Sequence, residues 1–195
     1  MKKSKLLMII GSLLLLGLFV FPLWNITLEA PQYPTPLGMD IHITKFTDTH
    51  EHDIKNINLM NHYVGMQYIP ETIPEFKIFP WVIGFMIALG VIIGLKGNRK
   101  LFLFWFILMS LIGIAGMYDF YLWEYDYGHN LDPKAIMNFK NPDGTPMGFQ
   151  PPLFGSKDIL NFTAHSYPRT GAYFMFTGML LTLAAFFVGK KEANK

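Results

Sequence analysis

The sequence predicts an all-α membrane protein with four transmembrane helices, in which two extracytoplasmic segments form a small mixed α/β cap. Three observations predict this fold class. Only 15% of the 195 residues are charged, whereas a typical soluble domain has about 25%. The missing charge corresponds to four apolar stretches of 18 residues. The basic residues cluster in the short segments before, between and after these stretches.

The four apolar stretches cover residues 6–23, 78–95, 101–118 and 171–188, and each predicts a transmembrane helix. At about 1.5 Å per residue, such a helix extends about 27 Å, close to the roughly 30 Å thickness of a hydrocarbon core. The alternative is four buried helices of a soluble protein, but those normally show a polar face. The first stretch ends without a small-residue cleavage site, which favours a retained anchor over a signal peptide.

The distribution of positive charge predicts the orientation. Nine of the sixteen Lys and Arg residues lie in residues 1–5, 96–100 and 189–195. The positive-inside rule places these short segments in the cytoplasm. We therefore expect cytoplasmic termini, and long segments 24–77 and 119–170 that are extracytoplasmic. The general character of the chain is bacterial, so the expected membrane is a bacterial inner membrane and these segments are expected to be periplasmic.

The two outer segments contain local patterns of their own. Alternation of apolar and polar residues over 39–46 predicts a strand. Residues 53–66 have helical apolar spacing and predict a short helix that ends near Gly65. Residues 119–133 are expected to continue the third transmembrane helix above the bilayer, and residues 156–164 to form another short helix.

The outer segments also hold the groups that can bind cations. They contain all six histidines, and their seven basic and thirteen acidic residues give a formal charge of −6. Such a surface attracts cations. The chain has no cysteine, which excludes disulfides, thiolate metal sites and iron–sulfur clusters. No apolar stretch contains a histidine, so we also expect no haem.

The run from Met60 to Met66 is the most specific local pattern. On a helix, His62 and Met66 are four residues apart and lie on one face. Imidazole and thioether together favour copper, because the soft sulfur selects Cu(I). Ordinary packing of these side chains is the alternative. Other residues that could supply ligands from elsewhere in the fold are Met39, His42, His129, Met147 and His165.

Asp119 stands where the third apolar stretch meets the membrane surface. An acid at that depth indicates a functional residue, and the alternative is an ion pair with Arg169 at a similar depth. No nucleophile–base pair, phosphate-binding loop or carboxylate dyad stands out. The sequence therefore does not predict an enzyme.

Four strings, at residues 53–66, 73–78, 123–133 and 150–162, resemble a family of small bacterial membrane proteins. The family is encoded beside nitrous-oxide-reductase genes, notably in Bacteroidetes-type clusters, and the resemblance covers nearly the whole chain. It implies accessory work in denitrification, such as supplying copper to the periplasmic reductase, and it implies no catalytic residues. The positions that match the family strings are Asn61, His62, Met66, Tyr127, His129, Asn130 and Asp132.

The expected partners are membrane lipid and the periplasmic reductase or its maturation proteins, and no nucleic acid is expected. Two alternatives to a copper-handling role stay open. The many interfacial Tyr and Trp residues suit a quinol-linked redox partner that feeds electrons to a periplasmic reductase. The same aromatic surface suits a metal-free docking scaffold.

Overall fold

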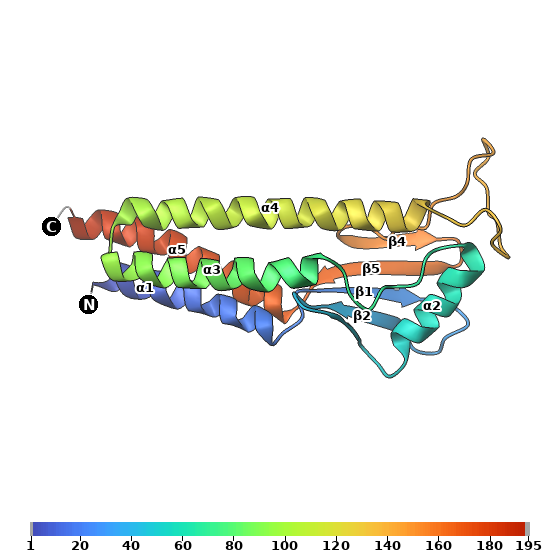
Figure 1. Ribbon diagram of the computed structural model, residues 1–195, viewed down its shortest axis with the longest axis horizontal. Helices are drawn as coiled ribbons and strands as arrows, with labels where there is room; N and C mark the ends of the chain where they lie inside the picture. The colour runs from blue at the N-terminus through green and yellow to red at the C-terminus, as the bar shows by residue number, and fades with distance from the viewer. Residues whose placement is uncertain (1, 194–195) are drawn as a thin grey trace.

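The computed structural model describes residues 2–193, which form a helical bundle and, at one end of it, a sheet domain (Figure 1). Both described chain ends lie at the opposite end of the bundle (Figure 1). The described chain has five α-helices and a five-stranded antiparallel sheet. The prediction of an all-α protein with four transmembrane helices is therefore wrong.

Within residues 2–193, three helices are long and apolar enough to cross a membrane: α3 (Glu75–Lys96), α4 (Arg99–His129) and α5 (Thr170–Ala193). Each contains one of the predicted apolar stretches. Gly97 has a left-handed φ of 77° and ends α3, and the Asn98 side chain accepts a hydrogen bond from the N–H of Lys100 to cap α4. This short connection makes α3 and α4 antiparallel neighbours.

The first apolar stretch departs from the prediction. It forms an 11-residue α-helix, α1 (Lys3–Leu13), followed by a 3-10 helix, η1 (Leu14–Phe19). The N–H groups of Val20 and Phe21 both donate to the carbonyl of Gly17, at 3.1 and 2.8 Å. Pro22 follows and has no N–H to continue a helix. The stretch is therefore not one continuous α-helix of spanning length.

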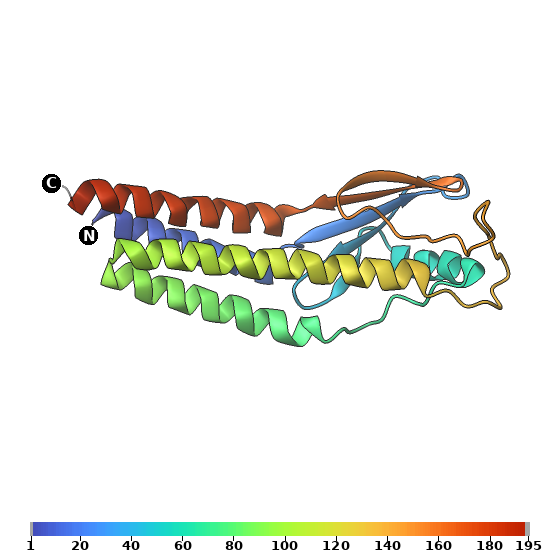
Figure 2. The same ribbon diagram turned by 90° about the horizontal axis from the view of Figure 1, so that it is seen from above.

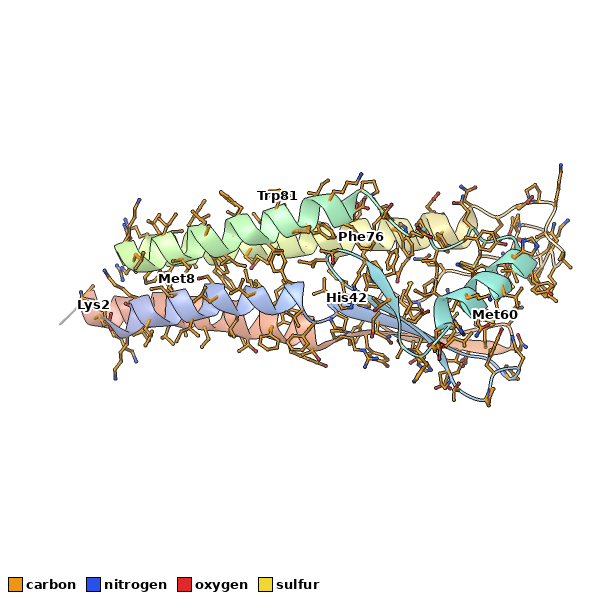
Figure 3. The ribbon with its side chains drawn as sticks, turned by 60° about the horizontal axis from the view of Figure 1, so that its bottom comes forward. Lys2, Met8, His42, Met60, Phe76 and Trp81 are labelled. Carbon is orange, nitrogen blue, oxygen red and sulfur yellow. The ribbon has the colours of Figure 1, made fainter. Side chains whose placement is uncertain are left out.

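The bundle buries one side of α1 against α5 and α3. Met8 of α1 is fully buried there, whereas Trp81 of α3 points away from the bundle (Figure 3). The outward side chains of α3, α4 and α5 are mostly large and apolar, as expected of helices that face lipid.

The sheet unites the two predicted outer segments. Its strand order is β3-β2-β1-β5-β4. The first segment supplies β1, β2 and β3, the second supplies β4 and β5, and β1 pairs with β5 along its whole length. The strands are β1 (Trp24–Glu29), β2 (Leu37–Ile41), β3 (Phe46–Asp48), β4 (Gly155–Ile159) and β5 (Phe162–Pro168).

Two local predictions in the outer segments need correction. The alternating run 39–46 is not one strand, because the chain turns between β2 and β3, where the N–H of His42 donates to the carbonyl of Lys45 at 2.9 Å. Residues 156–164 form no helix. They belong to the β4–β5 hairpin, since β5 finds a backbone partner in β1 that no local pattern reveals.

The predicted short helix is confirmed as α2 (Asp53–Val64), and Gly65 follows it with a left-handed φ of 82°. The buried Asp53 carboxylate joins α2 to the sheet. It accepts hydrogen bonds from the backbone N–H groups of Gly38 and His50, at 2.8 and 2.9 Å. The helix is thereby held against the β2–β3 hairpin.

Helix α4 links the bundle to the sheet domain. Its 31 residues extend about 46 Å, well beyond the roughly 30 Å of a hydrocarbon core. The turns after residue 118 run alongside the sheet (Figure 2). Phe120, Trp123 and Tyr127 there pack against a core that includes Ile26 and Ile57.

Candidate functional site

A cavity of about 90 Å³ lies between the sheet, α2 and the upper turns of α4. Successive strand residues point to opposite faces of a sheet. Four of the five strands line the cavity with residues of one face: Ile26 and Leu28 of β1, Met39 of β2, Ile159 of β4, and Phe162 and Ala164 of β5. Phe149 and Pro151, which precede β4, close one side. Its wall is almost entirely apolar.

Helix α2 and the residues after it form the second wall. Met60, Asn61 and Val64 line the cavity from the helix. The left-handed Gly65 then reverses the chain, and the N–H of Met66 donates to the carbonyl of Asn61 at 2.9 Å. Because of this reversal, Met66 also lines the cavity. With Met39, three methionines therefore line the cavity, and the sulfur of Met60 accepts a hydrogen bond from the Gln32 amide at 3.5 Å.

Glu124 of α4 is the only acid in the cavity wall. Its side chain is 0% exposed, and neither carboxylate oxygen has a hydrogen-bond partner among residues 2–193. It lies above the apolar stretch 101–118, on the face of α4 that packs against the sheet. Burial raises the pKa of this carboxyl from 4.5 to about 8. Burying an ionised carboxylate without a partner is costly, so the acid is mainly protonated at neutral pH.

Two other polar side chains line the cavity. The amide of Asn61 donates to the backbone carbonyl of Gln67 at 3.3 Å, and the Tyr127 hydroxyl donates to the same carbonyl. Burial raises the pKa of Tyr127, against the opposing effect of its hydrogen bond with Asn61. The phenol therefore stays neutral. Glu124 is the cavity group that can carry charge.

Of the predicted site residues, Met60, Asn61 and Met66 come together at the cavity, whereas His62 does not line it. His62 and Met66 do not share a helix face, because α2 ends at Val64. The His62 ring is exposed and lies parallel to the ring of Tyr68, with their centroids 6.3 Å apart.

The remaining candidate ligands lie outside the cavity wall. The ring of His129 stacks on Tyr125, and its Nδ1 lies 2.9 Å from the Tyr125 carbonyl oxygen. His165 lies on the opposite face of the sheet from its cavity-lining neighbour Ala164, and its Nδ1 is 2.7 Å from Ser156 Oγ. Met147 belongs to the loop before β4, and His42 to the turn after β2 beside the bundle (Figure 3).

Two acids that the sequence analysis named as candidate site residues, Asp119 and Asp132, do not line the cavity. Arg169 forms its ion pair with Asp40, at 3.2 Å between Nε and Oδ1, and not with Asp119. Asp119 is exposed, and partial burial together with the charge of Glu75 raises the pKa of its carboxyl. Asp132 supports the end of α2, because its N–H donates to the carbonyl of Gly65 at 2.8 Å.

No group of three His, Asp or Glu side chains within residues 2–193 is placed to share a metal ion. The cavity itself offers three methionines together with one carboxylate. The sequence analysis did not single out Glu124 as a candidate site residue. A signal existed in the sequence, since positions 120, 123, 124 and 127 share one helix face and the other three residues are aromatic.

No known protein family, curated protein or solved structure matches the chain. The family resemblance of the four strings therefore stays a prediction, and the cavity is the feature that supports a function.

Proposed function

We propose that this is a membrane-anchored accessory protein that binds Cu(I) in the cavity of its outer domain. Its role is to hold or present copper at the periplasmic face of the inner membrane in support of nitrous oxide reductase. The observation that carries the proposal is that three methionines and an unpartnered buried carboxylate line one cavity. The role is binding and not catalysis.

The donor set fits a soft monovalent cation. Thioether sulfur selects Cu(I) over hard cations, whose usual ligands are oxygens. Met39, Met60 and Met66 would supply sulfur, and the Glu124 carboxylate would balance the positive charge in an otherwise apolar space. An ionised carboxylate buried beside a cation avoids the cost of an isolated buried charge. The same apolar wall would keep water from the bound ion.

The size of the cavity favours an ion over a quinol. An apolar cavity of about 150 Å³ is known to hold benzene, and the head group of a quinol is larger than benzene. The cavity here is about 90 Å³, which suffices for a metal ion but not for that ring. The quinol-linked alternative therefore gains no support from this site.

The proposed sidedness follows from charge. The apolar helices α3, α4 and α5 support membrane association, and the sheet domain lies at the end of the bundle away from the basic chain ends (Figure 1). With those ends in the cytoplasm, the cavity faces the periplasm. We propose nitrous oxide reductase as the protein that receives the copper, because the four sequence strings resemble a family encoded beside its genes.

Cu(I) titration of the detergent-purified protein against a competing chelator tests the site. Replacing Met39, Met60 and Met66 by Leu keeps side-chain volume nearly constant. This triple variant should bind Cu(I) on the order of 100-fold more weakly, since even changes to residues behind metal ligands cost about 10- to 100-fold in affinity.

Two variants serve as controls for the copper titration. Met147→Leu removes a thioether outside the cavity, and His62→Ala removes the histidine beside it, so both should bind like the wild type. Unchanged affinity in the triple variant would remove the cavity as the copper site. A loss of Cu(I) affinity in His62→Ala would instead place the copper site on the exposed face of α2.

The sidedness can be tested separately because the chain has no cysteine. In spheroplasts, Lys140→Cys in the loop before β4 should react with a membrane-impermeant maleimide. Lys190→Cys, near the end of α5, should react only after the membrane is permeabilised. The reverse pattern would place the cavity in the cytoplasm and end the proposed role.

A further inference from the structure

The face of the sheet that turns away from the cavity carries a hydrogen-bonded group of polar side chains. Helices α2 and α4 pack on the cavity face (Figure 2). On the other face, Ser156 of β4 lies directly opposite His165 of β5 in the register of the hairpin. The serine is exposed, and its Oγ lies 2.7 Å from Nδ1 of the histidine. A serine hydroxyl in hydrogen-bond contact with an imidazole is the pair that nucleophilic catalysis uses.

The second ring nitrogen of His165 faces an acid. Nε2 is shielded from solvent, has no hydrogen-bond partner among residues 2–193, and lies 3.4 Å from Oε1 of Glu29 in β1. Catalytic hydrogen bonds are often long in the free protein and tighten when substrate binds. A neutral imidazole carries one ring proton, and the carboxylate favours the placement of that proton on Nε2. Nδ1 is then free to accept the proton of Ser156.

Tyr167 supplies a fourth group. Its hydroxyl lies 3.3 Å from Ser156 Oγ, where a phenol can donate a hydrogen bond to the oxygen of a carbonyl under attack. The exposed ring of Phe154 meets the Tyr167 ring edge to face, with centroids 5.5 Å apart, and adds an apolar surface beside the serine. A cross-strand Ser–His pair alone would only stabilise the hairpin. Together with an acid and a phenol, it has the parts of an acyl-transfer site.

We propose that Ser156 and His165 form a nucleophilic site that hydrolyses small carboxylic esters, with Glu29 as a positioning residue and Tyr167 as the oxyanion donor. Residues so far apart in the chain meet here only through the registers of β1, β5 and β4. The site shares the sheet with the cavity but none of the residues that line it. It therefore goes beyond the proposed function and does not depend on copper.

The reaction consists of two acyl transfers. Ser156 Oγ bonds to the ester carbonyl carbon as its proton passes to Nδ1 of His165, and the carbonyl electron pair moves onto the oxygen that faces Tyr167. When the carbonyl re-forms, the bond to the alcohol oxygen breaks, and the alcohol leaves with the proton from His165. Water then attacks the acyl-serine in the same way, and the acid leaves as Ser156 recovers its proton.

Two measurements on the detergent-purified, metal-free protein test the site. A fluorophosphonate probe should label the wild type, and mass spectrometry should locate the probe on Ser156. Hydrolysis of p-nitrophenyl acetate should fall to the buffer rate in Ser156→Ala. It should fall about 100-fold or more in His165→Gln and in Tyr167→Phe, since a general base and an oxyanion donor each contribute at least that much. Glu29→Gln should lower kcat with little change in KM, because it acts through His165 and not on the ester.

Thr163→Val is the matched control. The Thr163 hydroxyl donates to Asp158 across the same hairpin at 2.8 Å, so this variant removes a cross-strand hydroxyl without changing the Ser–His pair. It should hydrolyse the ester at the wild-type rate, and an equal loss would assign the effect to hairpin packing and overturn the proposal. An unlabelled wild type, a probe on another residue, or hydrolysis that persists in Ser156→Ala would also overturn it. The labelling is measured on the wild type, so it does not depend on the folding of any variant.

Discussion

The metal-free protein should lose stability as the pH rises from about 5 to about 8, and Glu124→Gln should abolish this loss. The Glu124 carboxyl has a pKa of about 8 in the folded protein and an ordinary value of 4.5 in the unfolded chain. Between these values the folded state binds a proton that the unfolded state lacks, so stability falls with rising pH. Above about pH 8 both states are ionised and the loss is complete.

The expected size of this effect is a few kcal/mol, because each pKa unit corresponds to about 1.4 kcal/mol. Thermal unfolding of the detergent-purified protein, followed by circular dichroism at several pH values, measures it. Asp126→Asn is the matched control, since it neutralises an exposed acid on the same helix and should keep the wild-type pH dependence. An equal pH slope in Glu124→Gln would show that this carboxyl is not the group responsible.

The same substitution separates stability from function. A buried acid without a partner weakens the fold, and residues of this kind persist mainly where function requires them. Glu124→Gln should therefore give a protein that is more stable at pH 8 but binds Cu(I) less tightly than the wild type. A gain of stability with unchanged copper affinity would leave the acid without a role in the proposed site.

The apolar helices could be predicted because their signal is local. Charge-free runs of spanning length lie within α3, α4 and α5, and the end of α2 at Gly65 follows from residue type. The run 6–23 has the same composition, but Gly17 and Pro22 change its backbone in ways that hydropathy does not report. The sheet could not be predicted in full, because β1 and β5 are about 140 residues apart in the chain.

The candidate site shows the same division between local and distant information. Met60, Asn61 and Met66 could be found as one short run, and the structure brings them to one cavity. His165 could not be placed, because the direction of its side chain depends on strand register. His165 faces away from the cavity because its neighbour Ala164 faces toward it. The burial of Glu124 likewise depends on strands from both outer segments packing over α4.

Gly178→Ala should destabilise the bundle, whereas the same substitution at Gly84 should not. Gly178 of α5 lies against the backbone of Gly11 in α1, and a Cβ at Gly178 would fall on the Gly11 carbonyl oxygen. The contact is tight from both sides, since a Cβ at Gly11 would lie 2.6 Å from the Gly178 carbonyl oxygen. Backbone atoms cannot rotate away, so α1 must move off α5.

We expect a loss of about 1–3 kcal/mol from this overpacking, together with weakened docking of α1. A Cβ at Gly84 in α3 would meet no atom within 4 Å, so Gly84→Ala should gain up to about 1 kcal/mol from helix propensity. Unfolding in mixed detergent micelles with increasing dodecyl sulfate compares the two variants directly. Equal stability of the two would mean that α1 is not held by close backbone contact, and that its place beside α5 depends on side-chain packing alone.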